Sequence, residues 1–224
     1  MIDRKDKLSS ARKELSIESM GKVKRWEDHY TRRAREAQWL ARSVYKIEEI
    51  DKKVHLLHAG DRVLDLGCYP GSWSQYSVAK IGPKGDVVGV DLKNPDRFSS
   101  PRFKFIQADV LSLDVDWLRK QVGLRELVIS DLAPATSGIR VTDESRSMEL
   151  ALKALDIALA VVEKGGHFLC KVFEGPDVRA FRTELARHFS RVQTIRPSAV
   201  RKASTEIYVL AMNRRSEVAS SRTL

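Results

Sequence analysis

In the stretch Val63-Leu-Asp-Leu-Gly-Cys-Tyr-Pro-Gly-Ser-Trp-Ser-Gln-Tyr76, a short apolar run passes through two glycines into a helix-forming segment. Val63–Leu66 is typical of a buried strand, Gly67 to Gly71 of a tight turn, and the residues from Ser72 of a first helical turn. A strand that leads through glycines into a helix brings backbone N–H groups and the helix N-terminus close to a ligand. The same unit also occurs as a purely structural turn, so this stretch alone does not establish a binding site.

A carboxylate follows this motif at the distance expected for a nucleoside site. Asp91 lies 20 residues beyond Gly71 (91 − 71 = 20) and comes directly after a second apolar run, Val87–Val90. At this place an acidic residue accepts hydrogen bonds from two ribose hydroxyls. The spacing Gly67-x-x-x-Gly71 differs from the G-x-G-x-x-G of dinucleotide sites and lacks the third glycine. The pattern therefore favours a nucleoside cofactor without a pyrophosphate, S-adenosylmethionine rather than NAD.

Strands and helices are expected to alternate along the rest of the chain. Further strands are predicted at residues 103–107, 126–131, 167–175, 191–196 and 206–211. Helices are predicted at residues 41–50, 72–80, 117–122, 145–163 and 178–189. In the helix at 145–163, Leu152 belongs to the apolar face, and Gly165-Gly166 follow as its terminator. The alternation indicates an α/β fold with a mainly parallel sheet. Residues 26–212 are expected to form the domain, residues 1–25 a basic mobile arm and residues 213–224 a flexible tail.

A large positive charge dominates the composition. The 224 residues carry a net charge of +10, and 42% of them are hydrophobic. The hydrophobic fraction suffices for one sizeable core, and the charge indicates a polyanionic partner such as RNA. A merely basic, soluble protein has the same composition, so both interpretations stay open. No apolar run reaches the roughly 18–20 residues of a membrane span, and the N-terminus lacks the apolar region of a signal peptide. A cytoplasmic protein without a membrane partner is expected.

The cysteines point to no metal site. Cys68 and Cys170 lie beside predicted strands and belong to no cluster of His and Cys ligands, so we expect buried free thiols and no bound metal. A different signal comes from the segment 26–35, which is basic with interleaved aromatic residues. Its arginines, Arg32, Arg33 and Arg35, are suited to phosphate contacts, while Trp26 and Tyr30 either stack on bases or pack on the domain.

Charged residues near the predicted strand ends are candidate site residues. Asp109 follows one strand and either accepts from an adenine amino group or caps the next segment. Asp131 ends another strand, at the edge where open α/β sheets bind ligands. Lys171 lies in an otherwise apolar strand, where an unpaired ammonium is costly, so it is expected to face a carboxylate or a ligand. Lys46 falls off the apolar stripe of its helix, which is the usual position of a solvated lysine.

Four segments, DLGCYPGSWSQY, SDLAPATSG, KVFEG and RKASTEIYVLA, together resemble the FtsJ-type family of ribose 2′-O-methyltransferases. The resemblance runs from about Trp26 to Met212 and is greatest to the members that act on bacterial large-subunit ribosomal RNA. It implies a Rossmann-like methyltransferase fold, in which helices cover both faces of a seven-stranded, mostly parallel sheet whose last strand is antiparallel. It also implies S-adenosylmethionine as cofactor, and a uridine ribose of large-subunit ribosomal RNA, in the assembled subunit, as substrate.

The resemblance also implies roles for particular residues. The family's catalytic tetrad falls on Lys46, Asp131, Lys171 and Glu206. Its cofactor contacts fall on Gly71, Trp73, Asp91, Asp109 and Asp131. The chain departs from the family pattern mainly at Cys68-Tyr69, where small residues are usual, and at Ala135-Thr136, where Asn-Met is common.

The implied chemistry leaves two roles open for Lys171. A ribose hydroxyl is a poor nucleophile, so its proton must be removed or its developing charge stabilised. A neutral Lys171 acts as the base, whereas a charged Lys171 stabilises the forming alkoxide. Methylation of transfer RNA and a non-catalytic role in ribosome assembly are the alternative functions. A monomer is expected.

Overall fold

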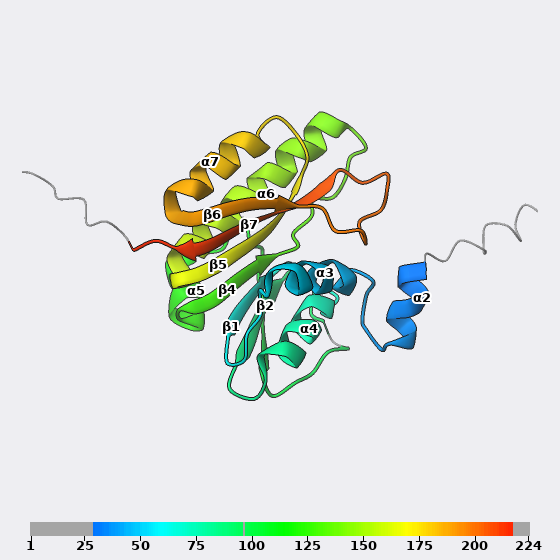
Figure 1. Ribbon diagram of the computed structural model, residues 1–224, viewed down its shortest axis with the longest axis vertical. Helices are drawn as coiled ribbons and strands as arrows, with labels where there is room; N and C mark the ends of the chain where they lie inside the picture. The colour runs from blue at the N-terminus through cyan, green and yellow to red at the C-terminus, as the bar shows by residue number, and fades with distance from the viewer. Residues whose placement is uncertain (1–28, 96, 217–224) are drawn as a thin grey trace, which may run out of the picture.

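A seven-stranded sheet runs through the protein (Figure 1). In spatial order its strands are β3 (Phe103–Gln107), β2 (Asp86–Asp91), β1 (Arg62–Leu66), β4 (Arg125–Ser130), β5 (Val162–Phe173), β7 (Glu206–Arg214) and β6 (Phe189–Ile195). The computed structural model describes residues 29–95 and 97–216. The predicted basic arm, Trp26 and most of the predicted tail lie outside these residues.

Most neighbouring strands are parallel. β1 pairs with β2 and with β4, β2 pairs with β3, and β4 pairs with β5, all in the parallel sense. β7 is antiparallel to both of its neighbours, β5 and β6. The expected seven-stranded, mostly parallel sheet with an antiparallel last strand is therefore confirmed. Because β7 runs the other way, its first residue, Glu206, lies at the edge where the parallel strands end, opposite Phe173 of β5.

Helices cover both faces of the sheet, as expected. On one face α3 (Val44–Val54) and α4 (Ser72–Ile81) pack against the sheet, together with Ala34 of α2 (His29–Glu36). On the other face lie α5 (Val115–Val122), α6 (Arg140–Val161) and α7 (Val178–His188). Along β1, Val63 joins the first core and Leu64 the second, because successive strand residues point to opposite faces. Burial on both faces explains why the central strands are mostly apolar, with Asp65 in β1 as a buried exception.

Several element boundaries differ from the sequence prediction. α6 begins at Arg140 and ends at Val161, and the predicted terminator Gly165-Gly166 lies inside β5. A register shift where β5 pairs with the start of β4 accommodates these glycines, and a Cβ on Gly166 would lie 2.7 Å from a backbone oxygen of β4. Leu152 is half exposed, because α6 buries a stripe of smaller residues that includes Ala151 and Ala154. β7 continues through Arg214, so the predicted tail begins two residues too early.

Among the described residues, no helix combines the length and the apolar character that crossing a membrane requires.

Candidate active site

Four charged residues from distant parts of the chain meet at the carboxyl edge of the sheet. Lys46 lies on α3, Asp131 directly follows β4, Lys171 lies near the end of β5, and Glu206 begins β7. Lys46 Nζ is 2.6 Å from Glu206 Oε1, and Lys171 Nζ is 3.2 Å from Asp131 Oδ1. The side chain of Lys171 is only 5% exposed, and its ammonium faces the carboxylate of Asp131. A carboxylate partner is what the position of Lys171 in an apolar strand predicted. The four residues named by the family resemblance thus form two ion pairs.

Tyr208 joins the two ion pairs. Its hydroxyl lies 2.7 Å from Asp131 Oδ1 and 2.6 Å from Glu206 Oε1, and its side chain is fully buried. A phenol has a single proton, so at any moment it donates to only one of the two carboxylates. Sequence reasoning missed this residue. The available signal was its spacing, because a residue two positions after Glu206 in a strand projects to the same face.

The charges in this cluster favour an ionised Asp131 and a protonated Tyr208. Burial by itself raises the pKa of Asp131, but the positive charges of Lys171 and Lys46, together with hydrogen bonds from Tyr208 and Lys171, hold the pKa below its ordinary value. Burial, together with the neighbouring carboxylates of Asp131 and Glu206, raises the pKa of Tyr208 well above its ordinary value. Tyr208 therefore acts as a hydrogen-bond donor, and the ammonium of Lys171 has an ionised partner.

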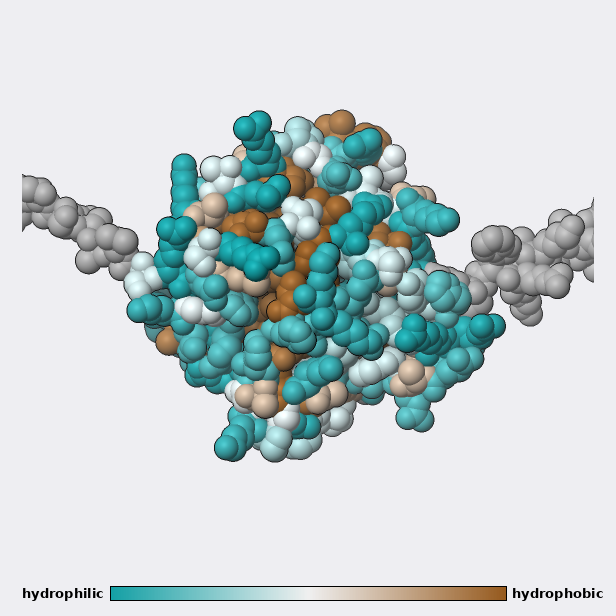
Figure 2. Space-filling model, viewed as in Figure 1, coloured by the Kyte–Doolittle hydropathy of each residue, from teal (hydrophilic) through white to brown (hydrophobic). Residues whose placement is uncertain are grey.

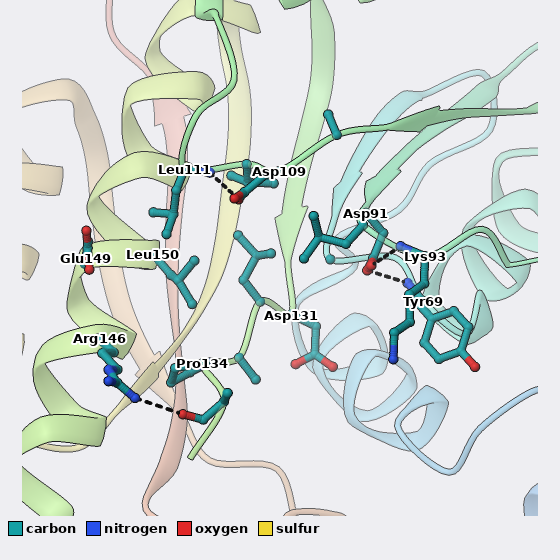
Figure 3. A pocket seen from close by; sticks show the side chains of 17 residues that line it. Tyr69, Asp91, Lys93, Asp109, Leu111, Asp131, Pro134, Arg146, Glu149 and Leu150 are labelled. Carbon is teal, nitrogen blue, oxygen red and sulfur yellow. Dashed lines mark hydrogen bonds between the residues drawn. The ribbon is translucent and has the colours of Figure 1, made fainter. Parts of the chain in front are cut away.

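A cavity of about 620 Å³ opens beside this cluster (Figure 3). It has the size of a small-ligand site. Asp91, Asp109 and Asp131, which come from three strand ends, line it together with the exposed leucines Leu92 and Leu111. Carboxylates suit the hydroxyl and amino groups of a nucleoside, and the leucines offer apolar contact to a planar base.

Asp91 and Asp109 also organise the backbone around the cavity. Asp91 accepts hydrogen bonds from the backbone N–H of Tyr69 at 2.9 Å and of Lys93 at 3.0 Å, which ties β2 to the glycine turn. Asp109 accepts from the backbone N–H of Leu111 at 3.0 Å, so the capping role is realised while the residue still lines the cavity. A carboxylate has about four acceptor sites, so both residues keep capacity for ligand hydroxyl or amino groups.

Gly71 and Trp73 are not among the residues that line the cavity. Gly71 is the N-cap of α4 with φ of 108°, and a Cβ there would lie 3.0 Å from the Leu40 side chain. Trp73 is buried, donates from Nε1 to the Ser43 carbonyl at 2.9 Å and packs against the ring of Tyr208. Their implied cofactor contacts stay predictions. Gly67 is the glycine at the cavity, where a Cβ would meet the backbone nitrogen of Leu132 at 3.0 Å.

The loop at residues 196–205, between β6 and β7, is held by α3 at both ends. Glu49 Oε2 accepts from the backbone N–H of Ser198 at 2.8 Å and from its hydroxyl at 2.6 Å, while Lys46 holds Glu206 just beyond the loop. The hydroxyl of Tyr30 on α2 lies 3.2 Å from the Ser198 hydroxyl, and its ring packs against Tyr45. Tyr30 therefore packs on the domain, the second of its two predicted roles.

Basic side chains lie exposed on α2 and on this loop. Arg32, Arg33 and Arg35 are exposed on α2, and Arg201 and Lys202 are exposed on the loop. Because Tyr30 and Ser198 connect the two elements, these cations form one surface beside the Lys46–Glu206 pair. We call it the basic surface. Its charge suits the phosphates of a nucleic acid.

The strand order β3-β2-β1-β4-β5-β7-β6 with an antiparallel β7 is that of a Rossmann-like methyltransferase fold, and the acidic residues at three strand ends surround a nucleoside-sized cavity, as such a protein requires. Residues 39–214 match the family model described as FtsJ-like methyltransferase, and the chain belongs to that family.

Curated relatives carry the name ribosomal RNA large subunit methyltransferase E. One from Bdellovibrio bacteriovorus is 44% identical over 191 residues, which cover 84% of this chain and 97% of the relative. Another from Myxococcus xanthus is 42% identical over 198 residues, covering 88% and 93%. A crystal structure described as a ribosomal RNA methyltransferase from Plasmodium falciparum matches with a TM-score of 0.70 and 28% identity, covering 79% of this chain and 98% of that one.

Proposed function

We propose that the protein transfers a methyl group from S-adenosylmethionine to the 2′-hydroxyl of a uridine ribose in large-subunit ribosomal RNA, within the assembled subunit. The observation that carries the proposal is the cluster Lys46–Glu206–Tyr208–Asp131–Lys171 at the rim of a nucleoside-sized cavity. The names of the relatives support the choice of substrate.

The cavity residues fit the cofactor. Asp91 is suited to the ribose hydroxyls, Asp109 to the adenine amino group, and Leu92 and Leu111 to the faces of the base. Gly67 lies so close to Leu132 that a side chain would not fit there. The turn therefore has no side chain at the place where the ligand must lie close to the backbone. Asp131, Gly71 and Trp73 complete the proposed set of cofactor residues. When bound, S-adenosylmethionine supplies an electrophilic methyl group on a sulfonium.

The residues of the cluster orient and polarise the ribose hydroxyl. Lys171 Nζ donates to the backbone oxygen of Asp131 at 2.6 Å and lies 3.2 Å from its carboxylate. Within the described part of the chain these contacts use two of its three ammonium hydrogens, so the third is available to a substrate oxygen. The ammonium of Lys171 is buried and lies against the carboxylate of Asp131. Of the two roles left open by the sequence, this ion pair supports the cation that stabilises the forming alkoxide, and the proton of the ribose hydroxyl leaves to water as the oxygen takes up the methyl group.

Lys46 and Glu206 form the second half of the cluster. Their 2.6 Å ion pair is largely shielded from water, and Tyr208 connects it to Asp131. The pair keeps Lys46 beside the strand ends, where a second positive charge strengthens the field at the ribose oxygen. Positioning of this kind accounts for a large share of the rate in a direct displacement.

The test uses methyl-labelled S-adenosylmethionine with three separate acceptors: free large-subunit ribosomal RNA, assembled large subunits, and transfer RNA. We expect label in the RNA of assembled large subunits, on one uridine, at a linkage that resists alkaline cleavage because its 2′-oxygen is blocked. Label in transfer RNA alone would show that transfer RNA, and not ribosomal RNA, is the substrate. Absence of transfer to all three would leave the non-catalytic alternative.

A further inference from the structure

Two aliphatic side chains at the start of α6 are unusually exposed. Val141 is 75% exposed and Ile139 63%, which makes them the most exposed large hydrophobic residues in the described part of the chain. Figure 2 shows hydrophobic surface gathered over the N-terminal end of α6, at the top of the view. We call Ile139 and Val141 the apolar tip. Exposed aliphatic residues are common one at a time, so the surroundings of the tip decide whether it has a role.

Hydrogen bonds hold the backbone of the apolar tip in place. The carboxylate of Asp143 accepts from the backbone N–H of Ser137 at 2.7 Å, from its hydroxyl at 2.8 Å and from the backbone N–H of Gly138 at 3.2 Å. The Ser137 hydroxyl in turn accepts from the backbone N–H of Ile139 at 3.2 Å. These contacts close the turn before α6, so the tip is presented outward by an ordered backbone.

The apolar tip is continuous with the candidate active site. The segment that leads to it starts at Asp131, and its next residues, 132–135, line the cavity. Arg146 of α6 also lines the cavity and donates to the carbonyl of Ala135 at 3.3 Å (Figure 3). The tip and the catalytic cluster therefore belong to one edge of the sheet. α6 packs on one face of the sheet and α3 on the other, so the tip and the basic surface flank the cluster from opposite sides (Figure 1).

We propose that the apolar tip packs against the face of an unstacked base in the single-stranded RNA segment that carries the target nucleotide. This inference rests on the proposed function, because it assumes that an RNA ribose lies at the catalytic cluster. A nucleotide reaches such a cluster only when it leaves its stack, and apolar contact replaces part of the stacking that neighbouring bases lose. The basic surface then binds phosphates on one side of the cluster, and Ile139 and Val141 bind a base on the other.

Size and charge favour RNA over a second copy of the chain. Two side chains bury far less area than the roughly 1,200 Å² or more of a stable protein interface. Two copies would also bring together chains that each carry a net charge of +10. The arginines nearest the tip, Arg140 and Arg146, are both exposed and suit the phosphates that flank a base.

The test replaces both tip residues by threonine, Ile139→Thr with Val141→Thr. Threonine keeps the β-branched shape, and its hydroxyl replaces a methyl group at Val141 and an ethyl group at Ile139, which leaves the backbone preference largely unchanged. Leu152→Thr is the matched control: it is 49% exposed on the same helix, 11 residues after Val141 (152 − 141 = 11), or about 16 Å along the axis. The probes are a fluorescein-labelled RNA hairpin with a uridine-containing loop and a fully paired RNA duplex.

We expect the double variant to bind the hairpin about ten-fold more weakly, with duplex affinity, cofactor affinity and the salt dependence of binding unchanged, because no phosphate contact is lost. Leu152→Thr should bind like the wild type. Unchanged hairpin affinity would overturn the proposal, and so would an equal loss on hairpin and duplex. A wild-type dimer that becomes monomeric in the double variant, measured by sedimentation, would overturn it in favour of self-association. If wild-type protein methylates none of the three acceptors, the proposed function fails, while the comparison of hairpin and duplex still judges the apolar tip.

Discussion

Replacing Tyr208 by phenylalanine removes one oxygen from the centre of the catalytic cluster and keeps the ring. That oxygen lies 2.7 Å from Asp131 and 2.6 Å from Glu206, and both carboxylates keep their lysine partners when it is lost. The ring contact with Trp73 also remains. The variant therefore tests the bridge between the two ion pairs without creating a large cavity.

The expected cost follows from burial. Removing one partner of a buried hydrogen bond to a charged group lowers the free energy of unfolding by about 1–3 kcal/mol. We expect Tyr208→Phe to stay within this range, because both carboxylates keep their lysine partners. Because the hydrogen bond from Tyr208 helps to lower the pKa of Asp131, that pKa should rise in the variant. Turnover should fall by roughly ten-fold, since the lysines remain present but lose a common anchor.

Urea unfolding measures the stability change, and single-turnover methyl transfer measures the rate. Tyr76→Phe is the matched control, because Tyr76 is also buried and donates its hydroxyl to a carboxylate, Asp51, away from the cluster. Both variants should lose stability, and only Tyr208→Phe should lose rate. Equal rates in the two variants would refute the bridging role. A loss as large as that of Lys171→Ala would mean that the phenol acts directly in the reaction.

Four further results are expected. Lys171→Ala should lower single-turnover methyl transfer by roughly 10²–10⁴, while calorimetry should find cofactor binding intact. For the wild type, a single-turnover rate that falls towards high pH supports the fixed cation, and a rate that rises supports the base. Asp91→Ala should weaken S-adenosylmethionine binding in calorimetry, each lost charged hydrogen bond being worth about 1.5–3 kcal/mol, and the exposed Asp116→Ala should not. Replacing the three arginines of α2 by glutamine should weaken binding to all RNA sequences and lower the salt slope by about 2, whereas an identical slope would make these arginines structural. Burial raises the pKa of Asp65 from 3.8 to about 7, so the folded state holds this proton more tightly; stability present below pH 3.8 is lost as pH rises towards 7, on the order of 1 kcal/mol per pH unit. In urea unfolding at pH 5 and pH 7, Asp65→Asn should lack this loss, and an equal pH dependence would contradict the assignment.

The sequence by itself determined the local order of the fold and the edge at which the site lies. The strand at Val63–Leu66, the turn to Gly71 and Asp91 after the next strand were all legible, because each signal depends on residues within a few positions. Lys171 was expected to face a carboxylate for a similarly local reason, the cost of a lone ammonium in an apolar strand. Resemblance to the family added the names of the residues that act together, without their geometry.

Only the tertiary structure decided which of these residues touch. Lys46 and Glu206 are 160 positions apart (206 − 46 = 160) and meet because β7 enters between β5 and β6 in the antiparallel sense. The same insertion sets Tyr208 beside Lys171 of β5 and so creates the bridge that the sequence did not reveal. The early start of β5, before the glycines that had indicated a helix end, likewise depends on its pairing with Arg125 of β4, a residue far away in the sequence. Strand order and direction depend on burying both faces of the whole sheet at once. The free energy of that burial depends on all the elements together, so no local sequence pattern contains it.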